Sequence, residues 1–326
     1  MTESAHPRES LAPNTLPLDS TAQLLTRITA QLGAQLSHVQ LNGVRRPMTP
    51  PTTERPGSAG PAAHRSAQPA RRTAAPTVVR APALVAVAHG SRDPRALHTV
   101  SRLLDRVREL RPRLDVRLGH IELNEPLLPA TLAGLGDRDA VLVPLLLGRG
   151  HHVKHDVPAA AAGAPLLRAR FAPPLGPHPL LVEALSARLH EAGWRTGDGT
   201  SPTTAVVLAA AGSRDPESAA DTRRTAELLS ERLGGVPVVP AYASALSPTV
   251  PDAVRALAAR GRHRIAVASY FTAPGRFAAA GAAAAPWIAA APLGAHPALG
   301  RLVLQRYDEA LAGHPPVSDQ RQLVTA

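Results

Sequence analysis

The sequence predicts an α/β protein built from two tandem copies of one domain, each with a parallel sheet flanked by helices. Residues 85–94 read VAVAHGSRDP, and residues 207–216 repeat this segment as VLAAAGSRDP. Further on, PLGPHP at residues 174–179 returns as PLGAHP at residues 292–297. In both copies, continuous apolar segments alternate with segments of helical spacing, which is typical of parallel strands covered on both faces.

The repeat supplies two domains of about 110 residues each within the 326 residues. Segments that do not belong to the repeat flank them. The amino-terminal segment is rich in Pro, Ala and Arg, cannot bury a core and is expected to be disordered, apart from an amphipathic helical pattern at 20–39. A Gly, Ser, Thr and Pro linker separates the domains. We expect an extension at 1–80, domains at 81–195 and 203–313, each large enough to bury its own core, and a tail at 314–326.

The elements of the first domain follow from the spacing of its apolar residues. Short apolar runs predict four strands, at 84–88, 115–121, 140–146 and 166–172. Helical spacing predicts the intervening and closing helices, at 95–111, 127–135, 157–162 and 178–192. Asp93 and Pro94 suit the N-cap and first position of the first helix. The second domain repeats this order over 205–312.

The composition limits the possible function classes. The chain has no cysteine, so disulfides and thiolate metal sites are excluded and a reducing cytoplasm is the expected location. No apolar run is long enough to span a membrane, and no signal peptide is evident. The net charge of +11 suggests nucleic acid, but only 2% of residues are aromatic, so base-stacking platforms are scarce. We expect no nucleic-acid and no membrane partner.

Three residues of the first copy combine chemistry with position. His89 follows the first predicted strand, Glu122 the second and His152 the third. Because the carboxyl ends of parallel strands meet at one edge of a sheet, we expect these side chains to converge there. Two imidazoles and a carboxylate can bind a metal ion or transfer protons.

The second copy supports a chemical role for these three residues. It carries Ala211, Ser244 and Phe277 at the corresponding positions, although the surrounding motifs persist. Residues that both copies keep are expected to be architectural, whereas side chains that vanish together from one copy are expected to be functional.

The residues around the three strand ends leave several roles open. Ser91 and Arg92 are shared with the second copy and belong to a capping motif, but they could also contact a substrate carboxylate. His151 and His155 form either a metal-loading patch or no site, and Asp156 is favoured as a helix cap. His178 and His296 precede proline in both copies and are interpreted as structural, while the role of His120 stays open.

The motifs HGSRDP at 89–94, Glu122 before Pro126, and GHH at 150–152 leading to DVP at 156–158 resemble the sirohydrochlorin chelatase family. These are class II metal chelatases that need no ATP, and the chain has no nucleotide-binding loop of the G-x-x-x-x-G-K type. The resemblance covers about residues 83–312 and implies the long form, in which two similar domains face each other across a cleft and one half holds the catalytic histidines.

The resemblance implies insertion of a divalent metal into sirohydrochlorin, with no permanently bound cofactor. His89, His152 and Glu122 would be the catalytic and metal-handling residues, although His151 competes with His152 for the place in the cleft. Ser91, Arg92 and Arg149 would bind the carboxylates of the substrate. Fe²⁺ insertion, which gives siroheme, is our leading hypothesis. The alternatives are Co²⁺ insertion in cobalamin synthesis and, in another class, a non-catalytic metal or tetrapyrrole carrier.

Overall fold

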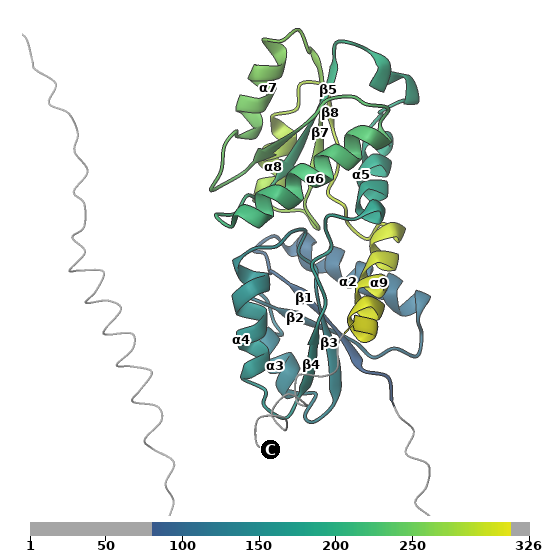
Figure 1. Ribbon diagram of the computed structural model, residues 1–326, viewed down its shortest axis with the longest axis vertical. Coiled ribbons are helices and arrows are strands. Elements are labelled where there is room, and N and C mark those ends of the chain that lie inside the picture. The colour runs from purple at the N-terminus through teal and green to yellow at the C-terminus, as the bar shows by residue number, and fades with distance from the viewer. Residues whose placement is uncertain (1–79, 314–326) are drawn as a thin grey trace, which may run out of the picture. The chain divides into compact units, whose positions relative to one another are not determined.

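The computed structural model describes residues 80–313 (Figure 1). The predictions for the segment before residue 80, including the helix at 20–39, and for the tail at 314–326 lie outside the described residues. Within the described part, no helix is long and apolar enough to cross a membrane.

The first copy forms a four-stranded parallel sheet with strand order β2-β1-β3-β4. Its strands are β1 (Ala83–Ala88), β2 (Val116–His120), β3 (Asp139–Pro144) and β4 (Arg168–Phe171). Its helices are α2 (Pro94–Leu110), α3 (Leu128–Ala133), α4 (Val157–Ala162) and α5 (Pro179–Glu191). Every residue of β1 is buried, as expected for a central strand with continuous apolar sequence.

The second copy forms a separate sheet with the same connectivity, in the order β6-β5-β7-β8. Its strands are β5 (Thr204–Ala210), β6 (Val238–Tyr242), β7 (Arg264–Tyr270) and β8 (Ile288–Ala289). Its helices are α6 (Pro216–Arg232), α7 (Val250–Ala258), α8 (Arg276–Ala283) and α9 (Pro297–Gly313). The predicted fold class, two tandem parallel α/β domains, is therefore confirmed. The predicted linker contains a short 3₁₀ turn at Thr196–Thr200.

The closing helices of the two copies are exchanged. Helix α9 packs against α2 and β3 of the first copy, whereas α5 packs against α6 and β7 of the second (Figure 1). The Tyr307 hydroxyl on α9 donates a hydrogen bond to the carbonyl of Pro82, at the start of β1. One continuous apolar cluster therefore contains residues of both sheets, while a smaller cluster lies on the other face of each sheet.

The exchange gives the two copies a shared core, although each is long enough to bury a core of its own. Amphipathic spacing shows that a helix buries one face, but it does not show which of two similar sheets that face will cover. Helix α9 brings Leu299, Leu302, Val303 and Tyr307 into the shared cluster. At about 1.5–3 kcal/mol for each large apolar side chain removed from water, this burial is a major stabilising term for the first sheet.

The predicted helix caps are present in both copies. The Asp93 carboxylate accepts a hydrogen bond from the Arg95 N–H at 3.0 Å, and Asp215 does the same for Glu217. His178 and His296 also cap helices, because each Nδ1 accepts from the backbone N–H two residues later, at 3.1 and 3.2 Å. The structural interpretation of these two histidines is confirmed.

Candidate active site at the strand ends of the first copy

The turn after β1 brings the ends of β1 and β2 into direct contact. Gly90 has φ +104°, and a Cβ atom at this position would lie 1.8 Å from the carbonyl oxygen of Glu122. The Glu122 N–H also donates to the carbonyl of His89 at 3.0 Å. Gly212 approaches Ser244 in the same way in the second copy. Glycine is required here because a side chain would displace the loop that carries Glu122.

The structure brings the three predicted residues together. The Nδ1 atom of His89 lies 3.5 Å from Oε1 of Glu122. The ring of His152 meets the ring of His89 edge to face, with centroids 4.6 Å apart and an interplanar angle of 87°. All three side chains are partly open to solvent, with His89 at 43% and His152 at 38% exposed. Two imidazoles and a carboxylate thus share the carboxyl edge of the first sheet.

The structure also distinguishes the adjacent histidines. His151 is 72% exposed, and its ring contacts that of His155, with centroids 4.6 Å apart. His152 is the one whose ring contacts His89, and it is the first residue of a turn of π-helix, His152–Asp156, which precedes α4. Single π turns in α-helices occur often at functional sites.

Asp156 has a different role from the predicted one. It lies inside the π turn with helical backbone angles, and its side chain caps no helix. Instead, its Oδ2 lies 2.5 Å from Nδ1 of His152. Since a carboxylate only accepts hydrogen bonds, Nδ1 carries the hydrogen and Nε2 keeps a free lone pair. The sequence held one signal for this pair, which is the spacing of four residues between His152 and Asp156.

The predicted three-ligand metal site is not preformed. Among residues 80–313, no group of three or more His, Asp or Glu side chains is arranged to hold a metal ion. The carboxylates of Glu122 and Asp156 lie beside the Nδ1 atoms of His89 and His152. The arrangement instead offers two imidazoles, each with a carboxylate behind it, which suits proton acceptance or transient metal contact.

Ser91 supports the turn after β1. Its hydroxyl accepts a hydrogen bond from the Asp93 N–H at 3.1 Å, and its own N–H donates to Oδ1 of Asn124 at 2.6 Å. Ser213 repeats the first contact in the second copy. Asn124, which the sequence analysis missed, thus joins the loops after β1 and β2. Arg92 is exposed beside these loops.

Arg149, predicted to bind substrate, bonds to the second copy. Its Nη2 lies 2.7 Å from Asp221, and its Nη1 lies 2.7 Å from Glu217, both on α6. These carboxylates raise the pKa of the Arg149 guanidinium, with the hydrogen bond to Asp221 as the largest cause. Nε, Nη1 and Nη2 each direct a hydrogen to these carboxylates, and the side chain stays 45% exposed, so a substrate contact by Arg149 stays a prediction.

The second copy lacks the chemistry at the equivalent place. The hydroxyl of Ser244, at the position of Glu122, donates to the carbonyl of Ala211 at 2.9 Å and thereby stabilises the loop. Phe277, at the position of His152, lies under the guanidinium of Arg276, 4.9 Å from the ring centroid. No imidazole is present at either position.

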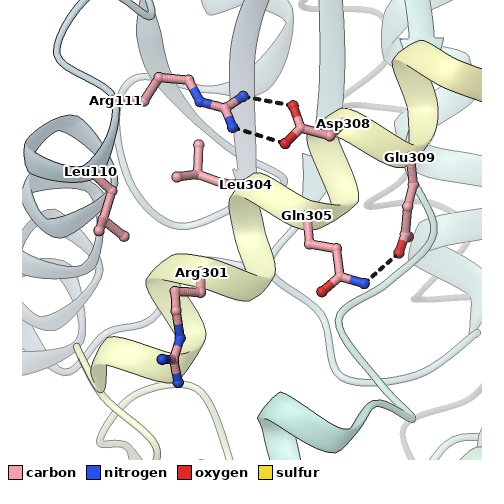
Figure 2. Close-up of a pocket in the computed structure, with 7 residues that line it drawn as sticks. All are labelled: Leu110, Arg111, Arg301, Leu304, Gln305, Asp308 and Glu309. Atoms are coloured by element: carbon pink, nitrogen blue, oxygen red, sulfur yellow. Dashed lines mark hydrogen bonds and ion pairs between the residues drawn. The ribbon is translucent and has the colours of Figure 1, made fainter.

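A surface cavity of about 390 Å³ lies elsewhere, between α2 and α9 (Figure 2). Figure 2 shows the guanidinium of Arg111 paired with the Asp308 carboxylate, at 2.6 and 2.8 Å, and Gln305 donating to Glu309. The charged groups of this cavity are paired, Arg301 with Glu183 outside the lining, and none of the predicted site residues lines it. The candidate site remains the open edge at the strand ends.

Comparisons with known proteins agree with the duplication. A family model described as CbiX matches residues 83–192 and again residues 205–310. The sirohydrochlorin cobaltochelatase of Priestia megaterium is 24% identical over 249 residues, which cover 70% of this chain and 79% of that protein. The sirohydrochlorin ferrochelatase of Bacillus subtilis is 27% identical over 177 residues, which cover 52% of this chain and 66% of that protein.

Solved structures share the fold. The structure titled "SirB from Bacillus subtilis with Fe3+" has a TM-score of 0.58 and 24% sequence identity, and the match covers 71% of this chain and 96% of that chain. The structure of a CbiX from denitrifying bacteria has a TM-score of 0.55 and also 24% identity. With the family model matched twice and the same strand order in both sheets, the chain belongs to the CbiX family, of which it contains two tandem copies.

Proposed function

We propose that this protein is a sirohydrochlorin chelatase, which inserts a divalent metal ion into the tetrapyrrole macrocycle without ATP. The observation that carries the proposal is the pair of adjacent imidazoles of His89 and His152, each with a carboxylate beside Nδ1, in the first copy alone. The names of the relatives support the same activity, since they are sirohydrochlorin chelatases for cobalt or iron.

The chemistry of the reaction requires bases that stand close together. Metal insertion replaces two pyrrole N–H protons by one divalent ion, and the ion exchanges its waters for the ring nitrogens. His152 donates its Nδ1 hydrogen to Asp156, which fixes the ring orientation and directs Nε2 away from that carboxylate. That nitrogen accepts a pyrrole proton or contacts the incoming ion, and the partly exposed ring then passes the proton to water.

His89 supplies the second base. Its Nδ1 lies 3.5 Å from Oε1 of Glu122, so a carboxylate stands beside this ring as well. The edge-to-face contact holds the two rings 4.6 Å apart, so that both act on one macrocycle. One proton for each imidazole balances the reaction.

Arg92 is the proposed contact for the substrate carboxylates. It is exposed in the loop just before α2, three residues after His89. A guanidinium can hold a carboxylate through two parallel hydrogen bonds. Ser91 stays a prediction as a substrate contact, since its hydroxyl oxygen already accepts from the Asp93 N–H.

The choice between Fe²⁺ and Co²⁺ is a separate prediction from the chelatase activity. Imidazole and carboxylate accept both Fe²⁺ and Co²⁺, and the relatives carry the names of both activities. Fe²⁺ remains our prediction, and the proposed reaction needs no resident cofactor beyond the metal that is its substrate.

The test is anaerobic absorbance spectroscopy of sirohydrochlorin with Fe²⁺ or Co²⁺ and a catalytic amount of the full-length protein. We expect the metallated product to form faster than it does without protein. The final product concentration should exceed the protein concentration many times. The ratio of the two rates gives the preferred metal. Product that stops at the protein concentration would identify a carrier instead, and no acceleration with either ion would contradict the proposal.

A further inference from the structure

A cluster of ion pairs attaches the π turn of the first copy to the start of α6 in the second. The ammonium of Lys154 lies 2.6 Å from Oδ2 of Asp215 and 2.5 Å from Oε2 of Glu217. Lys154 is the only lysine of the chain, and it lies inside the π turn between His152 and Asp156. The residue that reaches across to the second copy is therefore part of the turn that holds a catalytic imidazole.

Arg149 anchors the other end of the same loop. Its backbone N–H and its guanidinium both bond to Asp221, whose side chain is only 4% exposed. Its Nη1 atom also lies beside Glu217, which Lys154 shares. We name Arg149, Lys154, Asp215, Glu217 and Asp221 the bridge cluster. It holds this loop at two points, Arg149 and Lys154.

The duplication shows that the bridge cluster is not needed for the two loops to meet. A Cβ atom on Gly150 would lie 3.5 Å from the Ser213 hydroxyl, and one on Gly275 would lie 3.8 Å from the Ser91 hydroxyl. The backbone therefore comes close to the opposite copy in both directions. The ion pairs of the bridge cluster, however, form only between the loop of the first copy and α6 of the second copy with its N-cap.

The reciprocal positions cannot form such ion pairs. Pro274 and Ala279 stand where the first copy has Arg149 and Lys154. On the opposite side, Arg95 stands where the second copy has Glu217, and it pairs with Asp93 of its own loop at 2.7 Å. The bridge cluster thus occurs only at the loop that carries His152 and Asp156.

We propose that Lys154 is a positioning residue, and that the second copy, which lacks the histidines, acts through Asp215 and Glu217 as a scaffold for the π turn. This inference rests on the proposed function of the two histidines. The ion pair fixes the turn on which His152 and Asp156 stand, and so keeps the ring of His152 against that of His89. The second copy contributes to the reaction without touching the reacting atoms.

The expected energies indicate that the ion pairs of Lys154 matter more for the geometry of the site than for the stability of the fold. The side chains of Lys154 and Glu217 are 34% and 44% exposed, and exposed ion pairs add only about 0–1 kcal/mol to stability. A displacement of about 1 Å at a reacting group can reduce the rate by about 100-fold. Loss of Lys154 should therefore change turnover far more than it changes folding.

The kinetic test compares Lys154→Met and Lys154→Arg with a matched control, Arg301→Met, in the full-length protein. Arg301 on α9 pairs with Glu183 on α5 at 2.6 Å, so this pair also joins the two copies but lies away from the π turn. We expect Lys154→Met to lower kcat by about 10- to 100-fold, with KM for sirohydrochlorin and the melting temperature nearly unchanged. Lys154→Arg should restore most of the turnover, and Arg301→Met should resemble the wild type.

The second readout needs no turnover. The ¹⁵N resonances of the imidazole ring report which nitrogen carries the hydrogen, and a His152→Gln variant assigns the signals of His152. We expect a single Nδ1–H form in the wild type and in Lys154→Arg, and averaged or broadened signals in Lys154→Met. The rings of His178 and His296, whose Nδ1 atoms accept hydrogen bonds, should stay unchanged in every variant.

The two readouts separate this inference from the proposed function. If the wild type inserts no metal, the proposed function fails, and the ring signals still decide whether Lys154 positions His152. Unchanged His152 signals in Lys154→Met would overturn the inference, whatever the turnover. An equal loss of turnover in Arg301→Met would also overturn it, because the cause would then be general loosening between the copies.

Discussion

At the scale of single residues, the site consists of imidazoles whose Nδ1 atoms face carboxylates. The sequence could predict His89, Glu122 and His152, because all three are lost together from the second copy while its framework persists. It could not predict the partner of Asp156. An aspartate before Val157 and Pro158 has the sequence of a helix N-cap, and only the π turn places its carboxylate beside His152.

Asp156→Asn tests the carboxylate behind His152. The amide oxygen can still accept the Nδ1 hydrogen, but the negative charge beside the ring is lost. We expect kcat for metal insertion to fall by about 10- to 100-fold, as is usual for partners behind a reacting histidine. Asp137→Asn, in an exposed turn, is the control. Wild-type turnover in Asp156→Asn would show that the pair is structural only.

Gly90→Ala tests the contact between the ends of β1 and β2. The new Cβ would lie 1.8 Å from the Glu122 carbonyl oxygen, in addition to the strain of φ +104°. Gly136→Ala is the matched control, since φ is +62° there and the space is empty. Urea unfolding should show a loss of about 1–2 kcal/mol for Gly136→Ala and of about 3–5 kcal/mol for Gly90→Ala. Equal losses would mean that the contact imposes no constraint.

At the scale of elements, strands and helices could be predicted closely from apolar spacing and caps. The predicted strand at 84–88 is β1, and the predicted helix at 95–111 is α2, each within one residue at its boundaries. The prediction was weaker where the backbone departs from regular geometry, because apolar spacing does not distinguish a π turn from the α-helix that it precedes.

The histidine caps of α5 and α9 predict a pH dependence of stability. Burial lowers the pKa of both His178 and His296, and nearby arginines lower it further. Each ring must be neutral at Nδ1 to accept the backbone N–H. The folded state binds these protons less tightly than the unfolded state does. The contribution of the two caps to the free energy of unfolding is therefore fully present above the ordinary histidine pKa of about 6.5. It is lost as the pH falls through the lowered folded pKa.

The measurement is the free energy of unfolding in urea at pH 7.5 and at pH 5.5. The double variant His178→Asn/His296→Asn keeps a capping side chain that does not titrate. We expect acidification to destabilise the wild type more than the double variant. His120, whose pKa burial also lowers, titrates in both proteins and cancels in the comparison. Equal losses would contradict a capping role for the neutral rings.

At the scale of the whole molecule, the duplication could be predicted but the exchange of α5 and α9 could not. Repeat similarity establishes that two equivalent helices exist, and their spacing establishes that each buries an apolar face. Which sheet receives each face depends on the path of the chain between the copies and on the packing of both sheets. The shared cluster of the two sheets is the result.

A chain truncated after Gly294, which lacks α9, tests the exchange. Although α9 follows the second sheet in sequence, it covers α2 and β3 of the first. Hydrogen exchange should therefore show a larger loss of protection in β1 and β3 than in β5 and β7. The full-length chain is the reference. A loss confined to the second sheet would mean that α9 stabilises its own copy.

The central claim is that one copy performs the chemistry, through His89 and His152, while the other supports it. The most direct test is anaerobic metal insertion over many turnovers by the wild type and by His89→Ala, which reproduces the Ala211 of the second copy. His98→Ala, at an exposed position on α2, is the control. We predict a loss of about 100-fold or more for His89→Ala, with folding and the His98→Ala rate unchanged. Turnover of His89→Ala at the wild-type rate would contradict the account.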